Sequence, residues 1–178
     1  LTNYPPKLWP NPFIFRNYPD AMTYPQRPFH VYFKNSLIYT VVATVGTTLS
    51  SAFVAFGFSR VQFKHRDKLF IMVLSTMMLP AQVTLIPQFV LFYKLGWIDT
   101  LRPLWLPAWF GGGAFAIFLM RQFFMGIPQD LSDAARMDGA SELGIWWRIV
   151  MPISTPVLAA VAIFTFQFAW NWFLHPLV

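Results

Sequence analysis

The chain has 178 residues, of which 56% are hydrophobic, only 11% are charged and none is cysteine. Soluble domains carry about a quarter charged residues, so this composition offers too little polar surface to cover a water-exposed globule. The absence of cysteine excludes disulfides, thiolate metal sites and a cysteine nucleophile. The net charge of +6 fits the basic cytoplasmic loops of a membrane protein better than nucleic-acid binding.

Residues 1–35 form the first predicted domain, a segment on the external side of a membrane. Its prolines, at positions 5, 6, 10, 12, 19, 25 and 28, exclude a long helix. Tyr, Phe and Trp lie between these prolines, and such side chains gather at membrane interfaces. Two roles remain open for this segment: an aromatic belt that anchors the first span, or a docking surface for a partner.

The second predicted domain, residues 36–178, contains stretches long enough to cross a bilayer as helices. A crossing needs about 20 mainly apolar residues, because each helical residue advances about 1.5 Å through a core of about 30 Å. The predicted spans cover residues 36–58, 69–93, 103–120 and 153–174. The sequence therefore predicts an all-α, polytopic helical bundle in the lipid bilayer.

Prolines and glycines interrupt two of these spans. Pro80 and Pro87 lie within the second span, where they indicate either a broken helix that lines a pathway or a kink that serves packing. Gly111, Gly112 and Gly113 lie in the third span, where they predict close helix contact or a break, without a ligand role.

Basic residues set the predicted orientation. The loop after the first span carries an excess of them over its single acid, and the positive-inside rule then places that loop in the cytoplasm. The basic residues concerned are Arg60, Lys64, Arg66 and Lys68. Residues 1–34 and 94–102 are then external, residues 121–148 are cytoplasmic, and the C-terminus points outward.

The stretch 128–152 is too charged to be a span, since each charge at the membrane centre costs roughly 2.5–3.5 kcal/mol. Its charged residues are Asp130, Asp133, Arg136, Asp138, Glu142 and Arg148. Pro128 nevertheless suits a helix start, Gly139 suits its stop, and Ser141 suits the cap of a second helix. That second helix would carry one apolar stripe, made by Leu143, Trp146, Trp147 and Val150. We therefore expect a two-helix elbow on the cytoplasmic face.

The expected elbow contains a distinctive run. Residues 133–141 read Asp-Ala-Ala-Arg-Met-Asp-Gly-Ala-Ser, and Ile-Val-Met-Pro follows at 149–152. This pattern resembles the EAA loop of binding-protein-dependent ABC importer permeases, with Asp133 in place of Glu and Met151 in place of Leu. The Asp-Gly-Ala-Ser form is similar to the carbohydrate-uptake branch, specifically the maltose-type second permease subunit. Shorter stretches in the expected order extend the resemblance over nearly the whole chain.

The resemblance implies the ABC type I importer permease fold, with a coupling helix that docks on a separate ATP-binding cassette subunit. The implied coupling residues are Asp133, Ala134, Ala135, Asp138, Gly139 and Pro152. Asp133 would supply charge or a hydrogen bond at the docking surface, and the alanines would allow close approach. Gly139 would permit the bend, or would serve only as a helix C-cap.

Further partners follow from the same resemblance: a sister permease subunit, an extracytoplasmic solute-binding protein and a carbohydrate substrate. The expected location is the plasma membrane of a bacterium or archaeon. Permeases of this branch resemble six-span proteins, so the chain is expected to be a fragment that lacks the first and last spans.

Three polar residues in the spans, Gln82, Gln167 and Asn171, are the candidates for a translocation path. No catalytic group, cofactor or metal site is expected, and no Gly-x-x-x-x-Gly-Lys phosphate loop is present, so ATP hydrolysis is expected in a partner. The alternative interpretations are a secondary transporter or channel driven by an ion gradient, and a membrane-embedded enzyme. The first would require ionisable residues inside the spans, and the second a polar catalytic cluster there.

Overall fold

The computed structural model describes residues 14–23 and 28–172, and within these ranges every regular element is a helix. The chain divides into two compact units, Leu1–Leu37 and Ile38–Val178. Residues 1–13, 24–27 and 173–178 lie outside the described ranges. A large part of the predicted external segment, and the last two residues of the fourth predicted span, therefore fall outside them too.

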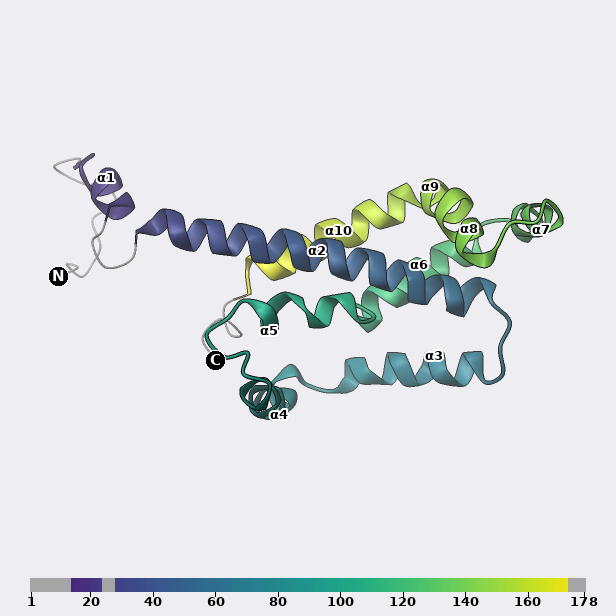
Figure 1. The fold of residues 1–178 in the computed structure, drawn as a ribbon, viewed down its shortest axis with the longest axis horizontal. Helices are drawn as coiled ribbons and strands as arrows, with labels where there is room; N and C mark the ends of the chain where they lie inside the picture. Colours follow the sequence, from purple (N-terminus) through teal and green to yellow (C-terminus); the bar gives the residue numbers. More distant parts are fainter. Residues whose placement is uncertain (1–13, 24–27, 173–178) are drawn as a thin grey trace, which may run out of the picture. The chain divides into compact units, whose positions relative to one another are not determined.

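The first unit contains α1 (Asn17–Met22) and the start of α2 (Phe29–Arg60), whose remainder belongs to the second unit (Figure 1). α2 begins at Phe29, ahead of the span predicted from Ser36, because Pro28 favours a helix start. The fixed φ of proline suits a first turn, and the Pro28 carbonyl accepts from the Val31 N–H at 3.0 Å.

The second predicted span, residues 69–93, is two helical segments that meet at 98°. The first comprises α3 (Arg66–Ser75) and the 3₁₀ turn η1 (Thr76–Met78), and the second is α4 (Ala81–Lys94). The break falls at Pro80, because proline disfavours helical backbone in the residue before it, and Leu79 is extended with ψ 119°. Pro87 lies inside α4 without ending it. The predicted break is thus observed at Pro80, whereas a role in lining a pathway stays a prediction, and the second proline is a helix-interior residue.

The third predicted span, residues 103–120, is also interrupted. It begins with α5 (Arg102–Trp105) and the 3₁₀ turn η2 (Pro107–Trp109), and it continues after a glycine-rich break as α6 (Ala114–Met125). Gly112 has φ +60° and lies so close to α2 that a Cβ atom there would be 2.0 Å from Ser51 Oγ. The glycines therefore provide both a break and a close helix contact.

The chain then forms the elbow and the last long helix. In order, these elements are α7 (Gln129–Met137), α8 (Glu142–Ile145), the π-helical segment η3 (Trp146–Val150), α9 (Met151–Ile153) and α10 (Thr155–Trp170). The helix that begins at Glu142 bends by 80° at Ser154 before α10. The predicted start of the fourth span at residue 153 therefore falls at this bend.

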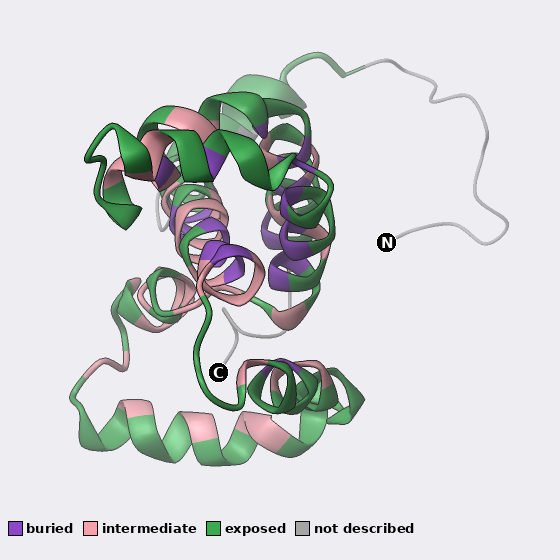
Figure 2. Ribbon diagram, turned by 90° about the vertical axis from the view of Figure 1, so that its right-hand side faces the viewer, coloured by how far each residue is buried: buried purple, intermediate pink, exposed green. Residues whose placement is uncertain are grey.

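The core of the second unit lies where α2, α3, α6, the elbow and α10 pack together, as Figure 2 shows by the purple positions. Its fully or nearly fully buried residues are Ala52, Ala55, Phe56, Phe70, Ala116, Ile117, Met120, Phe124, Ile127, Ile145, Val150, Val157 and Val161. α4 contributes no buried residue. This larger cluster therefore lies toward the end of α2 and α6 from which the elbow extends, and a smaller buried cluster is formed by Tyr39, Ala43 and Ala169.

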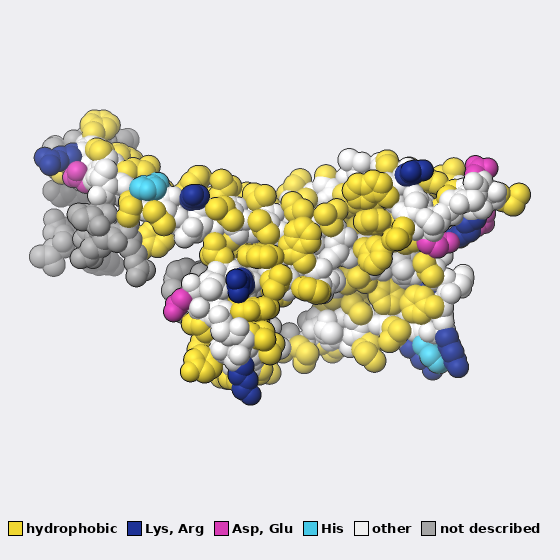
Figure 3. Space-filling model, in the orientation of Figure 1, with side chains coloured by type: hydrophobic (Ala, Val, Ile, Leu, Met, Phe, Trp, Pro, Cys, Tyr) yellow, Lys and Arg dark blue, Asp and Glu magenta, His cyan; other side chains and the backbone are white. Residues whose placement is uncertain are grey.

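Much of the surface of the second unit is apolar. On the face shown in Figure 3, hydrophobic side chains cover the middle, whereas charged side chains lie toward the two ends, among them those of the elbow and of the loop before α3. Two helical stretches of the described chain, Phe29–Arg60 and Arg102–Met125, are long and apolar enough to cross a membrane. The two bent pairs would raise the number of crossings to four if each is one span.

Candidate functional site

The elbow turns at Gly139, which closes α7 with a hydrogen-bonded cap. The Ala140 N–H donates to the Ala135 carbonyl at 2.9 Å, and the Gly139 N–H donates to the Arg136 carbonyl at 3.0 Å. These two bonds form a Schellman motif, which needs a left-handed residue at the position after the C-cap. Gly139 supplies it with φ +82°. Gly139 therefore occupies the position directly after the C-cap residue Asp138, and the same conformation makes the bend.

The second helix of the elbow starts at the cap that the sequence predicts. The Ser141 hydroxyl accepts from the Gly144 N–H at 3.2 Å, and Glu142 places a carboxylate at the positive end of the helix. The prediction for Ser141 is confirmed. The turn between the two helices is therefore held at both sides by hydrogen bonds to backbone groups.

A single guanidinium connects the two helices across this turn. Arg136 donates from Nε and Nη2 to the two oxygens of Glu142, at 2.7 and 3.2 Å, and from Nη1 to Asp133 at 2.6 Å. The hydrogen bonds to Glu142 raise the pKa of Arg136 above its ordinary value, so the guanidinium stays charged. Each acid is about half exposed, so each pair contributes modestly to stability. The fork nevertheless fixes the angle of α8 relative to α7.

The predicted coupling residues occupy different positions on the elbow. Asp133, Ala134, Asp138 and Gly139 are exposed, whereas Ala135 is half-buried and packs against the core. Pro152 is exposed in α9, separated from α7 by α8 and η3. Asp133, Ala134, Asp138 and Gly139 are therefore exposed within α7 and the turn that follows it, and Pro152 lies in a later element. Asp133 is already bonded to Arg136, which the sequence did not indicate.

The predicted apolar stripe on the second helix is wrong. Val150 is fully buried, but Leu143 is 61% exposed and Trp147 is 59% exposed. η3 follows Leu143, and because a π-helical turn bonds i to i+5, it shifts the face that the residues after Leu143 present. The buried pair is Ile145 and Val150, five residues apart. A period of 3.6 residues therefore does not describe this stretch.

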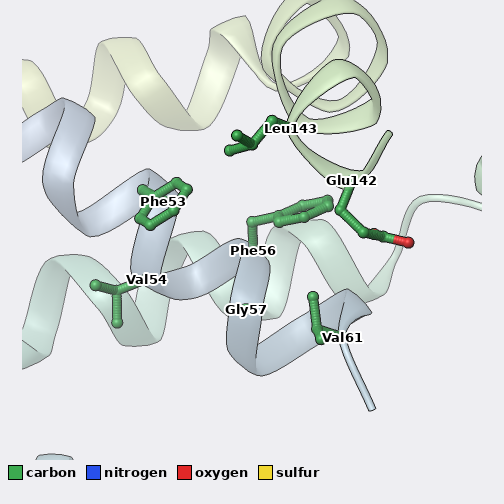
Figure 4. A pocket seen from close by; sticks show the side chains of 7 residues that line it. All are labelled: Phe53, Val54, Phe56, Gly57, Val61, Glu142 and Leu143. Atoms are coloured by element: carbon green, nitrogen blue, oxygen red, sulfur yellow. The ribbon is translucent and has the colours of Figure 1, made fainter. Parts of the chain in front are cut away.

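A small apolar pocket lies between the end of α2 and the start of α8 (Figure 4). It has a volume of about 250 Å³. It is lined by Phe53, Val54, Phe56, Gly57, Val61, Glu142 and Leu143. The Glu142 carboxylate is held by Arg136, so the wall that faces the pocket is apolar.

Two buried polar residues at the elbow were not identified from the sequence. Ser132 on α7 is only 1% exposed, although it lies among charged residues. Arg60, which was assigned to the loop after the first span, is the last residue of α2 and is 4% exposed. It donates from Nη1 to the Gln129 side chain at 2.7 Å, and from Nη2 to the carbonyls of Phe124, at 2.6 Å, and Ile127. Its place directly after an apolar run is a signal for a helix-terminal position, but the run does not reveal these partners.

The three polar candidates for a path fall on two helices. Gln82 lies exposed in the first turn of α4. Gln167 and Asn171 lie at the end of α10, where Asn171 Nδ2 donates to the Gln167 carbonyl at 2.7 Å. Among the described residues, no group of three His, Cys, Asp or Glu side chains is placed to hold a metal ion.

Long helices with apolar outer faces, joined by a compact polar elbow, define an integral membrane protein of the polytopic α-helical class. The chain belongs to the family described as binding-protein-dependent transport system inner membrane component, whose family model matches residues 48–178. The predicted family and the all-α permease fold are therefore confirmed.

Individual relatives agree with this assignment. The arabinooligosaccharides transport system permease protein AraQ of Bacillus subtilis is 39% identical over 151 residues, which are 83% of this chain and 53% of that protein. The sn-glycerol-3-phosphate transport system permease protein UgpE of Yersinia enterocolitica is 34% identical over 97% of this chain and 60% of its own length. The chain thus spans about half to three-fifths of these relatives.

A solved structure shares the fold. A chain from the crystal structure of a bacterial ABC transporter involved in the import of the acidic polysaccharide alginate matches with a TM-score of 0.69 and 30% sequence identity. The match covers 78% of this chain and 48% of that one.

Proposed function

We propose that the chain is part of a permease subunit of an ATP-driven ABC importer. In this proposal it forms part of the path of a carbohydrate across the membrane, and its elbow docks on a separate ATPase subunit. The observation that carries the proposal is the elbow, a polar two-helix projection that packs against the buried core. Its turn is closed by the cap at Gly139 and by the hydrogen bonds of Arg136 to Glu142 and Asp133. A rigid projection of this kind can transmit force from a soluble partner to the apolar helices.

The substrate class rests on the relatives. Two of them are named as permeases for arabinooligosaccharides and for sn-glycerol-3-phosphate, and the matching solved structure comes from an alginate importer. All three are sugars or polyol derivatives, which supports a carbohydrate as the substrate of this chain. Gln82, Gln167 and Asn171 are the proposed polar contacts along the path, since each offers both a donor and an acceptor to hydroxyl groups.

The docking edge is proposed to consist of Asp133, Ala134, Asp138 and Gly139, which are exposed together. Ala135 supports this edge from below by its contact with the core, and Pro152 starts the turn of helix that leads to α10. Asp133 acts in this arrangement by orienting Arg136, in addition to any contact with the partner.

A proton- or ion-driven transporter is the competing function. Such transporters use carboxylates or histidines at membrane depth. No Asp or Glu occurs in α2, α4, α6 or α10. The absence of carboxylates from these helices favours the ATP-driven importer.

The test is uptake by the assembled complex. The full-length protein is reconstituted into vesicles with its sister permease and the ATPase, and a panel of labelled sugars is supplied with the binding protein. We expect uptake to require ATP and to persist when ionophores collapse the ion gradients. Uptake that continues without the ATPase subunit and stops with the ionophore would refute the proposal.

A further inference from the structure

α2 and α6 end side by side at the base of the elbow, each with its C-terminal end there (Figure 1). The last carbonyls of a helix lack intrahelical partners, and the helix dipole gives this end a partial negative charge. Two such ends in contact repel each other and leave acceptors unpaired in a buried region. The structure must therefore supply cations or donors at this contact.

Arg60 of α2 supplies a positive charge and hydrogen-bond donors to the end of α6. It is almost fully buried, and its Nη2 donates to the carbonyl of Phe124, in the last turn of α6, and to that of Ile127, just beyond it. Within the described ranges, Arg60 takes part in no ion pair with a carboxylate. Its charge is therefore balanced by backbone dipoles, an arrangement that the planar fork of arginine permits and the point charge of lysine matches poorly.

Arg121 makes the reverse connection from α6 to α2. Its Nε donates to the carbonyl of Phe58, in the last turn of α2, at 3.2 Å. Its guanidinium also lies 4.2 Å from the ring centre of Phe70 and 3.4 Å from Asp67, which ties α3 to the same place. Arg121 is 9% exposed. Each helix thus provides an arginine for the terminal carbonyls of the other.

The elbow is attached to this arrangement by Gln129. This residue is the first of α7, and its Oε1 accepts from Arg60 Nη1 at 2.7 Å. A displacement of α7 therefore acts on the same guanidinium that holds α2 and α6 together.

We propose that Arg60 and Arg121 form a reciprocal staple that transmits movement of the elbow to α2 and α6. The inference rests on the proposed importer function. Both arginines are positioning residues: they touch neither substrate nor nucleotide, and they act through Gln129 and the helix ends. Loss of the staple would leave docking possible but would disconnect it from the spans.

The experiment measures sugar transported per ATP hydrolysed in the complete complex. Arg60→Met should retain the ATPase subunit in a pull-down and continue to hydrolyse ATP. It should transport at least about tenfold less sugar per ATP, the effect of losing one charge-assisted hydrogen bond. In Arg60→Lys, the amount of sugar transported per ATP should be partly restored relative to Arg60→Met. Gln129→Ala leaves the carbonyl contacts of Arg60 intact, so it should lower the amount of sugar per ATP by less than Arg60→Met does. The control is Lys68→Met, which removes an exposed positive charge from α3 and should leave the ratio unchanged.

A second measurement separates the staple from the proposed function. Nitroxide labels at Val45 on α2 and Met137 on α7, both exposed, report the distance between α2 and the elbow. This distance should be narrowly distributed in the wild type and broad in Arg60→Met, whether or not the complex takes up sugar. If uptake by the wild type does not need ATP, the importer function fails while the distance test of the staple stands. An unchanged distribution in Arg60→Met, or a wild-type ratio in both Arg60→Lys and Gln129→Ala, would overturn the staple.

Discussion

Replacement of Gly139 by valine tests whether the elbow is the docking element. Gly139 has φ +82°, and nothing lies within 4 Å of the place where a Cβ atom would be. The new Cβ atom therefore meets no neighbour, and the cost considered for the substitution is backbone strain. A left-handed conformation costs an L-residue about 1–2 kcal/mol, and strained positions of this kind cost up to about 3 kcal/mol. Because valine is β-branched, we expect the cost of Gly139→Val to lie at the upper end of this range, about 3 kcal/mol.

The backbone strain should lower the affinity of the elbow for the ATPase subunit. Each 1.4 kcal/mol changes an equilibrium about tenfold, so the closed turn becomes up to about 100-fold less populated relative to open forms. We expect the affinity for the ATPase subunit to fall by up to this factor and sugar uptake to be lost, while the protein still inserts into the membrane. Gly139→Ala should have a smaller effect and Gly139→Asn the smallest, because asparagine tolerates the left-handed region.

The matched control is Gly96→Val. Gly96 has φ +65°, also with nothing within 4 Å of a Cβ atom, and it lies between α4 and α5, away from the elbow sequence. The same backbone strain there should leave the affinity for the ATPase unchanged. The assay is titration of the purified ATPase against each variant in membranes, with uptake measured in parallel. Wild-type docking by Gly139→Val, or an equal loss in Gly96→Val, would refute the argument.

Three more predictions concern other parts of the chain. A cysteine at Met137, which is 90% exposed, should react with an impermeant reagent only from the cytoplasmic side, and one at Lys94 only from outside; the reverse pattern would contradict the orientation. Gly112→Ala should lower the midpoint of thermal unfolding in detergent because the new Cβ atom meets Ser51 Oγ, at a cost of about 1–3 kcal/mol, and an unchanged midpoint would show that α2 can yield. Ser141→Ala should destabilise the elbow by about 0.5–2 kcal/mol, measured as faster amide exchange at the start of α8, and exchange at the wild-type rate would show that the cap contributes nothing.

The features that local sequence dictates were predictable. Gly139 and Ser141 act through their own backbone conformation and the nearest turn, so residue type and position were enough to anticipate a stop and a cap. The glycine-rich break before α6 was predictable for the same reason.

The features that depend on residues far apart in the sequence could not be predicted. Ser132 lies among charges and reads as an accessible position, yet packing buries it, so a cysteine there would be poorly accessible to reagents. Arg60 and Arg121 read as a loop charge and as the edge of a span, because their partners lie 51 to 69 residues away in sequence. The phase shift at η3 has no residue signature either, since its residues also suit an ordinary α-helix.

The separation between Arg60 and its partners also sets an order of events during synthesis. Its acceptors lie 64, 67 and 69 positions later in the chain. At about 5–20 residues per second, the ribosome delivers them roughly 3–14 s after Arg60 itself. During that interval the guanidinium lacks the two carbonyls and the Gln129 side chain that accept its hydrogen bonds in the folded protein. The end of α2 therefore stays unfastened until the third apolar segment has been inserted, and the elbow cannot reach its final position before then.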